Sequence, residues 1–275
     1  MPLDSKESLL KYMDSTEKES VTNLYYEIPP SREEAEAIQK ELQKRVITQN
    51  GFKEIKRVAG IDLAPIQGEE RLVCGIIVFS FPELEELERV SARVDEQFPY
   101  IPGLLAFREG PAIIEAFKKV KYKPDLIMVD GQGIAHPRGL GIASHVGVIL
   151  DIPSIGVAKK RLYGKYNEPP DSEGSWTPLI NPNRGSLKSL PPDGNVGSGG
   201  GFYRAPYSYP RSQGNTIGAV VRTKKGTKPV FVSIGHKIDL RTAVRITREC
   251  TKGYRIPEPT RKADIFVAQQ KTVKY

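Results

Sequence analysis

The chain has few cysteines, no long apolar segment and no apolar leader, and each shortage excludes a class of protein. Among 275 residues only Cys74 and Cys250 occur, far apart and without metal-ligand spacing, so we expect neither a disulfide framework nor a cysteine zinc site. No apolar run approaches the roughly 20 residues of a membrane helix. The first residues lack the apolar core of a secretion signal. We expect an intracellular protein without a membrane partner, in the cytoplasm, or in the nucleus if the organism is eukaryotic.

Positive charge is concentrated in the last fifth of the chain. The net charge is +8, and from Arg222 onward 14 Lys and Arg face 4 Asp and Glu. This asymmetry favours a polyanionic partner such as nucleic acid, because basic side chains release counterions from phosphates. A solvated basic helix and tail explains the same charges equally well. The basic residues that fit backbone contacts under the first interpretation are Lys224, Lys225, Lys228 and Lys237.

The first half of the chain predicts a helix followed by antiparallel strands. Residues 1–30 show weak periodicity and are interpreted as a weakly ordered arm. Ser31 opens a helix, because Ser-Arg-Glu-Glu forms a capping box and apolar residues then recur every four positions. Apolar stretches at 58–63, 72–81 and 87–94 predict three strands joined as a meander.

The later elements alternate between helix and strand. We expect a helix over 111–120 with proline in its first turn, and a buried strand over 126–129. A glycine-rich helix over 139–150 and a strand over 154–158 follow. The sequence therefore predicts an α/β fold with a central mixed sheet, part antiparallel meander and part parallel, flanked by helices. Further strands are expected at 217–221 and 230–232, and a basic helix at 240–249.

One segment interrupts the predicted single domain of residues 31–275. Between 168 and 215 the chain contains 8 Gly and 8 Pro, which is typical of a long loop and not of a packed core. Tyr203, Tyr207 and Tyr209 are able to stack on bases in single-stranded nucleic acid. A tyrosine-bearing disordered loop is the alternative.

Three acids stand at the ends of predicted elements. Asp62 and Asp130 each end an apolar run, and Glu109 lies at the mouth of a predicted helix. Ligands of open α/β sheets collect where parallel strands end, and carboxylates from separate segments suit a hard divalent cation. Two Mg²⁺ ions about 4 Å apart would activate water for phosphodiester cleavage, with Lys159 beside the phosphate. For each acid taken alone, a cap of a turn or helix is the alternative.

Several uninterrupted blocks of this sequence resemble the endonuclease V family. They are Pro99-Tyr100-Ile101-Pro102-Gly103, Leu105-Ala106-Phe107-Arg108-Glu109, the Asp-Gly-x-Gly-x-x-His-Pro-Arg block at 130–138, Gly156-Val157-Ala158-Lys159-Lys160, Ser233-Ile234-Gly235-His236 and Arg255-Ile256-Pro257-Glu258-Pro259-Thr260-Arg261. The resemblance covers about residues 33–167 and 216–268, and the blocks are long enough to be highly specific.

The resemblance implies a ribonuclease H-like fold and a metal-dependent endonuclease. Such an enzyme recognises inosine in DNA or RNA and cuts the second phosphodiester 3′ to it, leaving 3′-hydroxyl and 5′-phosphate ends. By motif position, Asp62, Glu109 and Asp130 would bind Mg²⁺, for which Mn²⁺ would substitute. Lys159 would lie near the scissile phosphate and His236 beside the metals. We expect a monomer whose partner is inosine-containing nucleic acid.

The resemblance also implies a wedge and a base pocket. Tyr100 would fill the space of the displaced base, and the two prolines beside it would keep its loop stiff. A packed aromatic beside turn prolines is the alternative for this residue. A pocket lined by backbone would reject guanine, whose additional amine would stay unsatisfied. The further substrate-binding residues expected are Pro99, Ile101, Pro102, Gly103, Leu105, Gly131, Gly133, His136 and Leu162.

Two rival functions and one choice of substrate remain open at this point. Another nuclease of the same fold would share the acids but lack the wedge and the pocket. A catalytically silent inosine-binding protein would bind without cutting. No residue identifies a reader of the ribose 2′-hydroxyl, so DNA and RNA are both candidates. A structural histidine is the alternative for His136.

Overall fold

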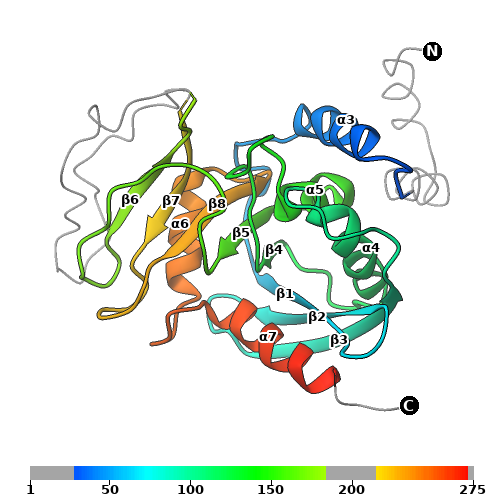
Figure 1. The fold of residues 1–275 in the computed structure, drawn as a ribbon. Helices are drawn as coiled ribbons and strands as arrows, with labels where there is room; N and C mark the ends of the chain where they lie inside the picture. The colour runs from blue at the N-terminus through cyan, green and yellow to red at the C-terminus, as the bar shows by residue number, and fades with distance from the viewer. Residues whose placement is uncertain (1–27, 184–214, 272–275) are drawn as a thin grey trace.

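Eight strands form one mixed sheet in the order β3-β2-β1-β4-β5-β8-β7-β6. The computed structural model describes residues 28–183 and 215–271 (Figure 1). β1 (Arg57–Pro65), β2 (Arg71–Ser80) and β3 (Glu86–Asp95) form the antiparallel meander. β4 (Leu126–Val129) and β5 (Ser154–Ala158) run parallel to β1. The mixed sheet confirms the predicted fold class.

The second half of the sheet is antiparallel. β8 (Val230–His236) pairs with β5, and β7 (Thr216–Val221) pairs with β8. β6 (Trp176–Ile180) then forms the outer edge beside β7. This strand lies inside the segment that composition predicted to be a loop throughout, so the prediction was wrong for these residues. β6 contains a proline, which has no N–H to donate. An edge strand tolerates the missing N–H, because only one of its sides pairs with another strand, here β7.

Helices cover both faces of the sheet (Figure 1). α4 (Leu105–Lys118) and α5 (Ile142–Leu150) pack over an apolar cluster that includes Ile61, Ile127 and Val129. α6 (Leu240–Glu249) and α7 (Glu258–Gln270) cover the other face, over a cluster that includes Val58 and Met128. The residues alternate between the two clusters along β1 and β4, as the period of a strand requires.

The helix boundaries test the sequence predictions in detail. α3 (Arg32–Gln43) begins as predicted, with the Ser31 hydroxyl accepting from the Glu34 N–H at 3.1 Å. α4 begins six residues earlier than predicted, and Pro111 lies inside it. Glu109 is therefore within this helix and not at its mouth. α5 begins at Ile142 instead of Gly139, and α7 was not predicted.

The predicted arm and loop fall largely outside the described residues. Residues 1–27 of the arm and 184–214 of the loop, with its three tyrosines, are not described. Ile28 packs beside an apolar cluster at the start of α3. Among the residues that the structure describes, no helix has the length and apolar character to cross a membrane.

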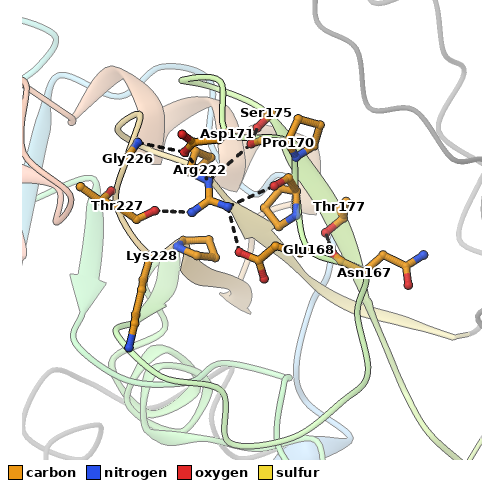
Figure 2. A network of polar contacts seen from close by, with 12 residues as sticks. Asn167, Glu168, Pro170, Asp171, Ser175, Thr177, Arg222, Gly226, Thr227 and Lys228 are labelled. Atoms are coloured by element: carbon orange, nitrogen blue, oxygen red, sulfur yellow. Dashed lines mark hydrogen bonds and ion pairs between the residues drawn. The ribbon is translucent and has the colours of Figure 1, made fainter.

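A buried arginine anchors the chain that leads into β6. Arg222, at the end of β7, donates to the Glu168 carboxylate at 2.8 Å and to the Pro169 carbonyl at 3.1 Å (Figure 2). The Gly226 N–H donates to Asp171 at 2.9 Å. These bonds hold the 168–171 segment against the β7–β8 loop. They stabilise a defined conformation in residues whose glycine- and proline-rich composition predicted only a loop.

Candidate functional site

Adjacent strands bring Asp62 and Asp130 to one edge of the sheet. Ile61 of β1 is paired with Val129 of β4, and the Asp130 N–H donates to the Ile61 carbonyl at 3.1 Å. The two acids follow these positions directly in strands that run the same way. Asp130 therefore directly follows the end of β4, and Asp62 lies beside it on the neighbouring strand. The prediction that Asp62 stands at the end of its element was wrong, because β1 continues to Pro65 by pairing with β2.

Lys159 reaches the same edge from β5. Its ammonium lies 2.7 Å from an Asp130 carboxylate oxygen and 3.1 Å from Asp264, in α7. Burial works to lower the pKa of Lys159, but the two carboxylates outweigh it and raise the pKa to about 12. Lys159 is therefore a stable cation at neutral pH.

Asp264 is a member of this cluster that the sequence analysis missed. Pro259, near the start of α7, lies against Gly60 so closely that a Cβ on Gly60 would be 2.0 Å from its carbonyl oxygen. This contact fixes how α7 crosses β1, and Asp264 is placed beside Lys159. The sequence contains a signal for Asp264. The family resemblance extends past Thr260, and Asp264 is a single acid among basic residues.

Burial and neighbouring negative charge raise the pKa of two acids of the cluster, Asp62 and Glu109. Burial and then the negative charge of Asp130 raise the pKa of Asp62 to about 7, and Asp264 adds to this effect. Burial and then the charge of Asp62 raise the pKa of Glu109 to about 8. Glu109 reaches the cluster from α4, on the other face of the sheet. Both carboxyl groups therefore bind protons near neutral pH, and a bound cation would favour their ionised forms.

The donor set fits a divalent cation of the Mg²⁺ type. Carboxylate oxygens from separate elements are hard ligands, and a dication would relieve their mutual repulsion. Within residues 28–183 and 215–271, no group of three or more His, Cys, Asp and Glu side chains is arranged to hold a metal ion. Mg²⁺ takes few protein ligands, because it keeps several waters and accepts substrate phosphate.

Arg255, between α6 and α7, supports the backbone of Lys159 and of the β7–β8 loop. Its guanidinium donates to the Lys159 carbonyl at 2.7 Å, to Lys228 at 2.7 Å and to Pro229 at 3.0 Å. Three backbone carbonyls from two segments are thereby held by one planar group. Lys228, a predicted phosphate contact, is thus near the site edge.

Close backbone packing explains the glycines after Asp130. A Cβ on Gly133 would be 1.9 Å from the Ile234 carbonyl oxygen, and one on Gly131 would be 2.5 Å from the Ile142 side chain. The Gly133 N–H donates to the Ser233 hydroxyl at 2.8 Å. Neither glycine has a positive φ angle, so close approach is the reason for both and not backbone conformation.

His236 does not lie at this site. It is paired with Ser154, the first residue of β5, whereas Lys159 follows the last. At about 3.3 Å per residue, this register separates the two by roughly 16 Å along the sheet. His236 Nδ1 accepts from the Ile47 N–H at 3.2 Å, and Asp151 lies 3.5 Å from Nε2. The structure therefore does not bring His236 to the acidic cluster, because the antiparallel register directs this strand end to the opposite edge.

Lys237 lies at that opposite edge as well. Its ammonium is 2.7 Å from Asp151, and the residue directly follows His236 at the end of β8. Lys237 therefore lies away from the acidic cluster.

The predicted substrate-binding residues around Tyr100 differ in how far their side chains are exposed to solvent. Tyr100 and Leu162 are 68% and 51% exposed, so neither is a packed core residue. Pro99 and Pro102 are exposed beside Tyr100, while Ile101 and Leu105 are half-buried. Because its side chain is largely exposed, Tyr100 is not an aromatic packed beside turn prolines, which was the alternative for this residue.

His136 is occupied within the protein. Its Nε2 is 3.1 Å from the Gly103 carbonyl, and its Nδ1 accepts from the Arg138 N–H at 3.2 Å. Because a carbonyl oxygen only accepts, Nε2 carries the proton and the ring is neutral. Burial and then the charge of Arg138 lower the pKa of His136 to about 4. Neither ring nitrogen is left for direct substrate contact.

The sheet, its helices and the acidic edge define the class of a ribonuclease H-like enzyme that acts on phosphodiesters. The endonuclease V family model matches residues 40–189 and 203–265. An endonuclease V from Rippkaea orientalis is 44% identical over 239 residues, which is 87% of this chain and 91% of the relative. The chain belongs to the endonuclease V family and is an endonuclease.

Solved structures of the family have the same fold. Endonuclease V from Streptomyces avermitilis has a TM-score of 0.74 and 35% identity, covering 89% of this chain and 94% of that one. Endonuclease V from Ciona intestinalis, at 26% identity and a TM-score of 0.64, covers 85% of this chain and 95% of its own. That structure is a complex with a 24mer DNA containing an inosine followed by a ribo-adenosine.

Proposed function

We propose that this endonuclease recognises inosine in nucleic acid and hydrolyses the second phosphodiester 3′ to it, leaving 3′-hydroxyl and 5′-phosphate ends. The observation that carries the proposal is the acidic cluster of Asp62, Glu109, Asp130 and Asp264 around Lys159 at the carboxyl edge of the sheet. The inosine-containing DNA bound by the Ciona relative supports the choice of base. We further propose that the enzyme acts as a monomer in the cytoplasm.

The carboxylates would hold Mg²⁺, with Mn²⁺ as a substitute. Asp62 and Asp130 are the first ligands proposed, with Glu109 and Asp264 completing the set from opposite faces of the sheet. When bound, such ions activate water and stabilise the oxygen that leaves the phosphorus. The two half-buried carboxyl groups lie on adjacent strands, and a bound cation would favour their ionised forms.

Lys159 would stabilise the negative charge that develops on the phosphate. Its ammonium is held between Asp130 and Asp264, and Arg255 fixes the backbone behind it. Placing a fixed cation where charge develops lowers the barrier without reorganisation during the reaction. The side chain is 37% exposed, so a phosphate can approach it from solvent.

Tyr100 would enter the base stack while the extruded base occupies a neighbouring pocket. Its ring projects from a loop between two prolines and is largely exposed. Gly131, Leu105 and Leu162 are the proposed walls of that pocket. Because removal of a base from a duplex costs a few kcal/mol, a mispaired inosine is extruded more readily than a sound pair.

The test is cleavage of matched strands that carry one inosine or one guanosine at the same position. Single-stranded DNA, duplex DNA and single-stranded RNA are each compared with Mg²⁺, with Mn²⁺ and with chelator. We expect metal-dependent cutting at the second phosphodiester 3′ to inosine and none at guanosine. Asp62→Ala and Asp130→Ala should abolish it, while Asp95→Ala, at an exposed carboxylate outside the cluster, should not.

Three results would contradict parts of the proposal. Equal cutting of guanosine strands would leave a nuclease without inosine specificity. Binding of inosine strands without cutting would indicate a silent binding protein. Undiminished cleavage by both aspartate variants would place the reaction elsewhere.

A further inference from the structure

The loop that carries Tyr100 ends in a tight turn. The Leu104 N–H donates to the Ile101 carbonyl at 2.9 Å, and Gly103 between them has φ of 82°. Proline followed by a glycine of positive φ at the two central positions is the pattern of a type II turn. Pro102 supplies the first of these positions. The turn directs the Gly103 carbonyl inward, away from the exposed Tyr100.

Three side chains from two distant segments donate to this one carbonyl oxygen. Gln39 of α3 donates through Nε2 at 2.9 Å, Arg138 through Nη2 at 2.7 Å and His136 through Nε2 at 3.1 Å. A carbonyl has two lone pairs, so three donors saturate it. Gly103 is also required sterically, because a Cβ there would be 2.8 Å from Arg138 Nη2.

Gln39 links these donors to one another. Its Oε1 accepts from Arg138 Nε at 2.5 Å, and its Nε2 also donates to the Leu140 carbonyl at 3.2 Å. The side chain is only 1% exposed, so its position is fixed by these bonds and by packing. A buried amide with every bond made gives a rigid arrangement, since leaving one unmade is costly.

We propose that Gln39, His136 and Arg138 form a clamp that positions the Tyr100 loop, and that the clamp determines how well the enzyme acts on inosine within a duplex. This inference rests on the proposed function, because Tyr100 must displace a base only where the base is paired and stacked. A rigid loop loses little conformational freedom when its ring enters the stack. A single strand presents its base without that step.

The first experiment compares Gln39→Met with Gln43→Met, the same change one turn further along α3 at an exposed position. The measured quantity is the ratio of kcat/KM on duplex DNA with a paired inosine to that on the same single strand. For Gln39→Met we expect the ratio to fall about tenfold or more, since misplacing a group by a fraction of an ångström has effects of this size. Gln43→Met should leave the ratio unchanged. Equal losses on both substrates would overturn the proposal.

A double-variant cycle tests whether the clamp acts through the wedge. Tyr100→Ala alone should lower the same ratio. The combination Gln39→Met/Tyr100→Ala should lower it no further, because a clamp has no effect once the ring is gone. If the losses of the two single variants multiply in the double variant, Gln39 acts through a group other than Tyr100. If Gln39→Met does not fold, Arg138→Lys, which keeps the charge and loses the planar fork, should have the same effect on the ratio.

Amide hydrogen exchange separates failure of the clamp from failure of the proposed function. Wild-type protein that cuts no inosine strand would refute the function and leave the clamp to be judged by exchange alone. In Gln39→Met the Leu104 amide should exchange at least about tenfold faster than in wild type, because local opening becomes easier. An unchanged rate at Leu104 would overturn the clamp whatever the substrate.

Discussion

Removing one charge from the acidic cluster should stabilise the protein when no divalent cation is present. The change is Asp62→Asn, which keeps the shape of the side chain. Burial and the charge of Asp130 raise the pKa of Asp62 from 3.8 to about 7. The folded protein therefore binds more protons than the unfolded chain between these values, and its stability falls as pH rises through this window.

The magnitude follows from the size of the pKa difference. Roughly 3 units at 1.36 kcal/mol each set an upper limit of about 4 kcal/mol at pH 8. Solvent at the open edge of the sheet and relaxation of the neighbouring side chains reduce this, and we expect about 2 kcal/mol. For a chain of this size that corresponds to a rise in Tm of roughly 4–8 °C.

Thermal unfolding in chelator at pH 4, 6 and 8 measures the effect. The variant should exceed wild type most at pH 8, and the difference should nearly vanish at pH 4, where the folded carboxyl is already protonated. Excess Mg²⁺ should raise the Tm of wild type more than that of the variant, because the cation loses a ligand. Asp95→Asn, outside the cluster, is the control. A Tm difference independent of pH, or a less stable variant in chelator at pH 8, would refute the reasoning.

Three further changes test the site and its support. Lys159→Met should lower the single-turnover cleavage rate by about 100-fold or more while the protein stays folded, because a fixed cation is lost from the reacting phosphate; a rate within threefold of wild type would exclude that role. Gly60→Ala should destabilise the protein by about 1–3 kcal/mol in urea titration, since its new Cβ would meet the Pro259 carbonyl; an unchanged midpoint would contradict the close packing of α7. His236→Gln should keep cleavage within about threefold of wild type, because the residue is roughly 16 Å from Lys159 along the sheet; a collapse of the rate at unchanged Tm would reverse this assignment.

Local pattern was sufficient for much of the sheet. The strands of the meander and the run that ends at Asp130 are short, apolar and bounded by turn residues, and such signals lie within a few neighbouring positions. The order of elements then limits the topology, because strands that alternate with helices pair in parallel. Asp62 and Asp130 could be assigned to one sheet edge on this basis. β6 could not, since its proline and flanking glycines resemble a loop until Arg222 and β7 order them.

Sequence by itself determined the family, the mixed sheet and the placing of two acids on adjacent strands, because these depend on residue identity and local periodicity. Only tertiary structure decided which other groups join them. Asp264 reaches the cluster because Pro259 packs on Gly60, and His236 is excluded because an antiparallel register sends it to the opposite edge. Both outcomes depend on contacts between residues far apart in the chain. Such contacts are determined by packing and strand register, which no short stretch of sequence contains.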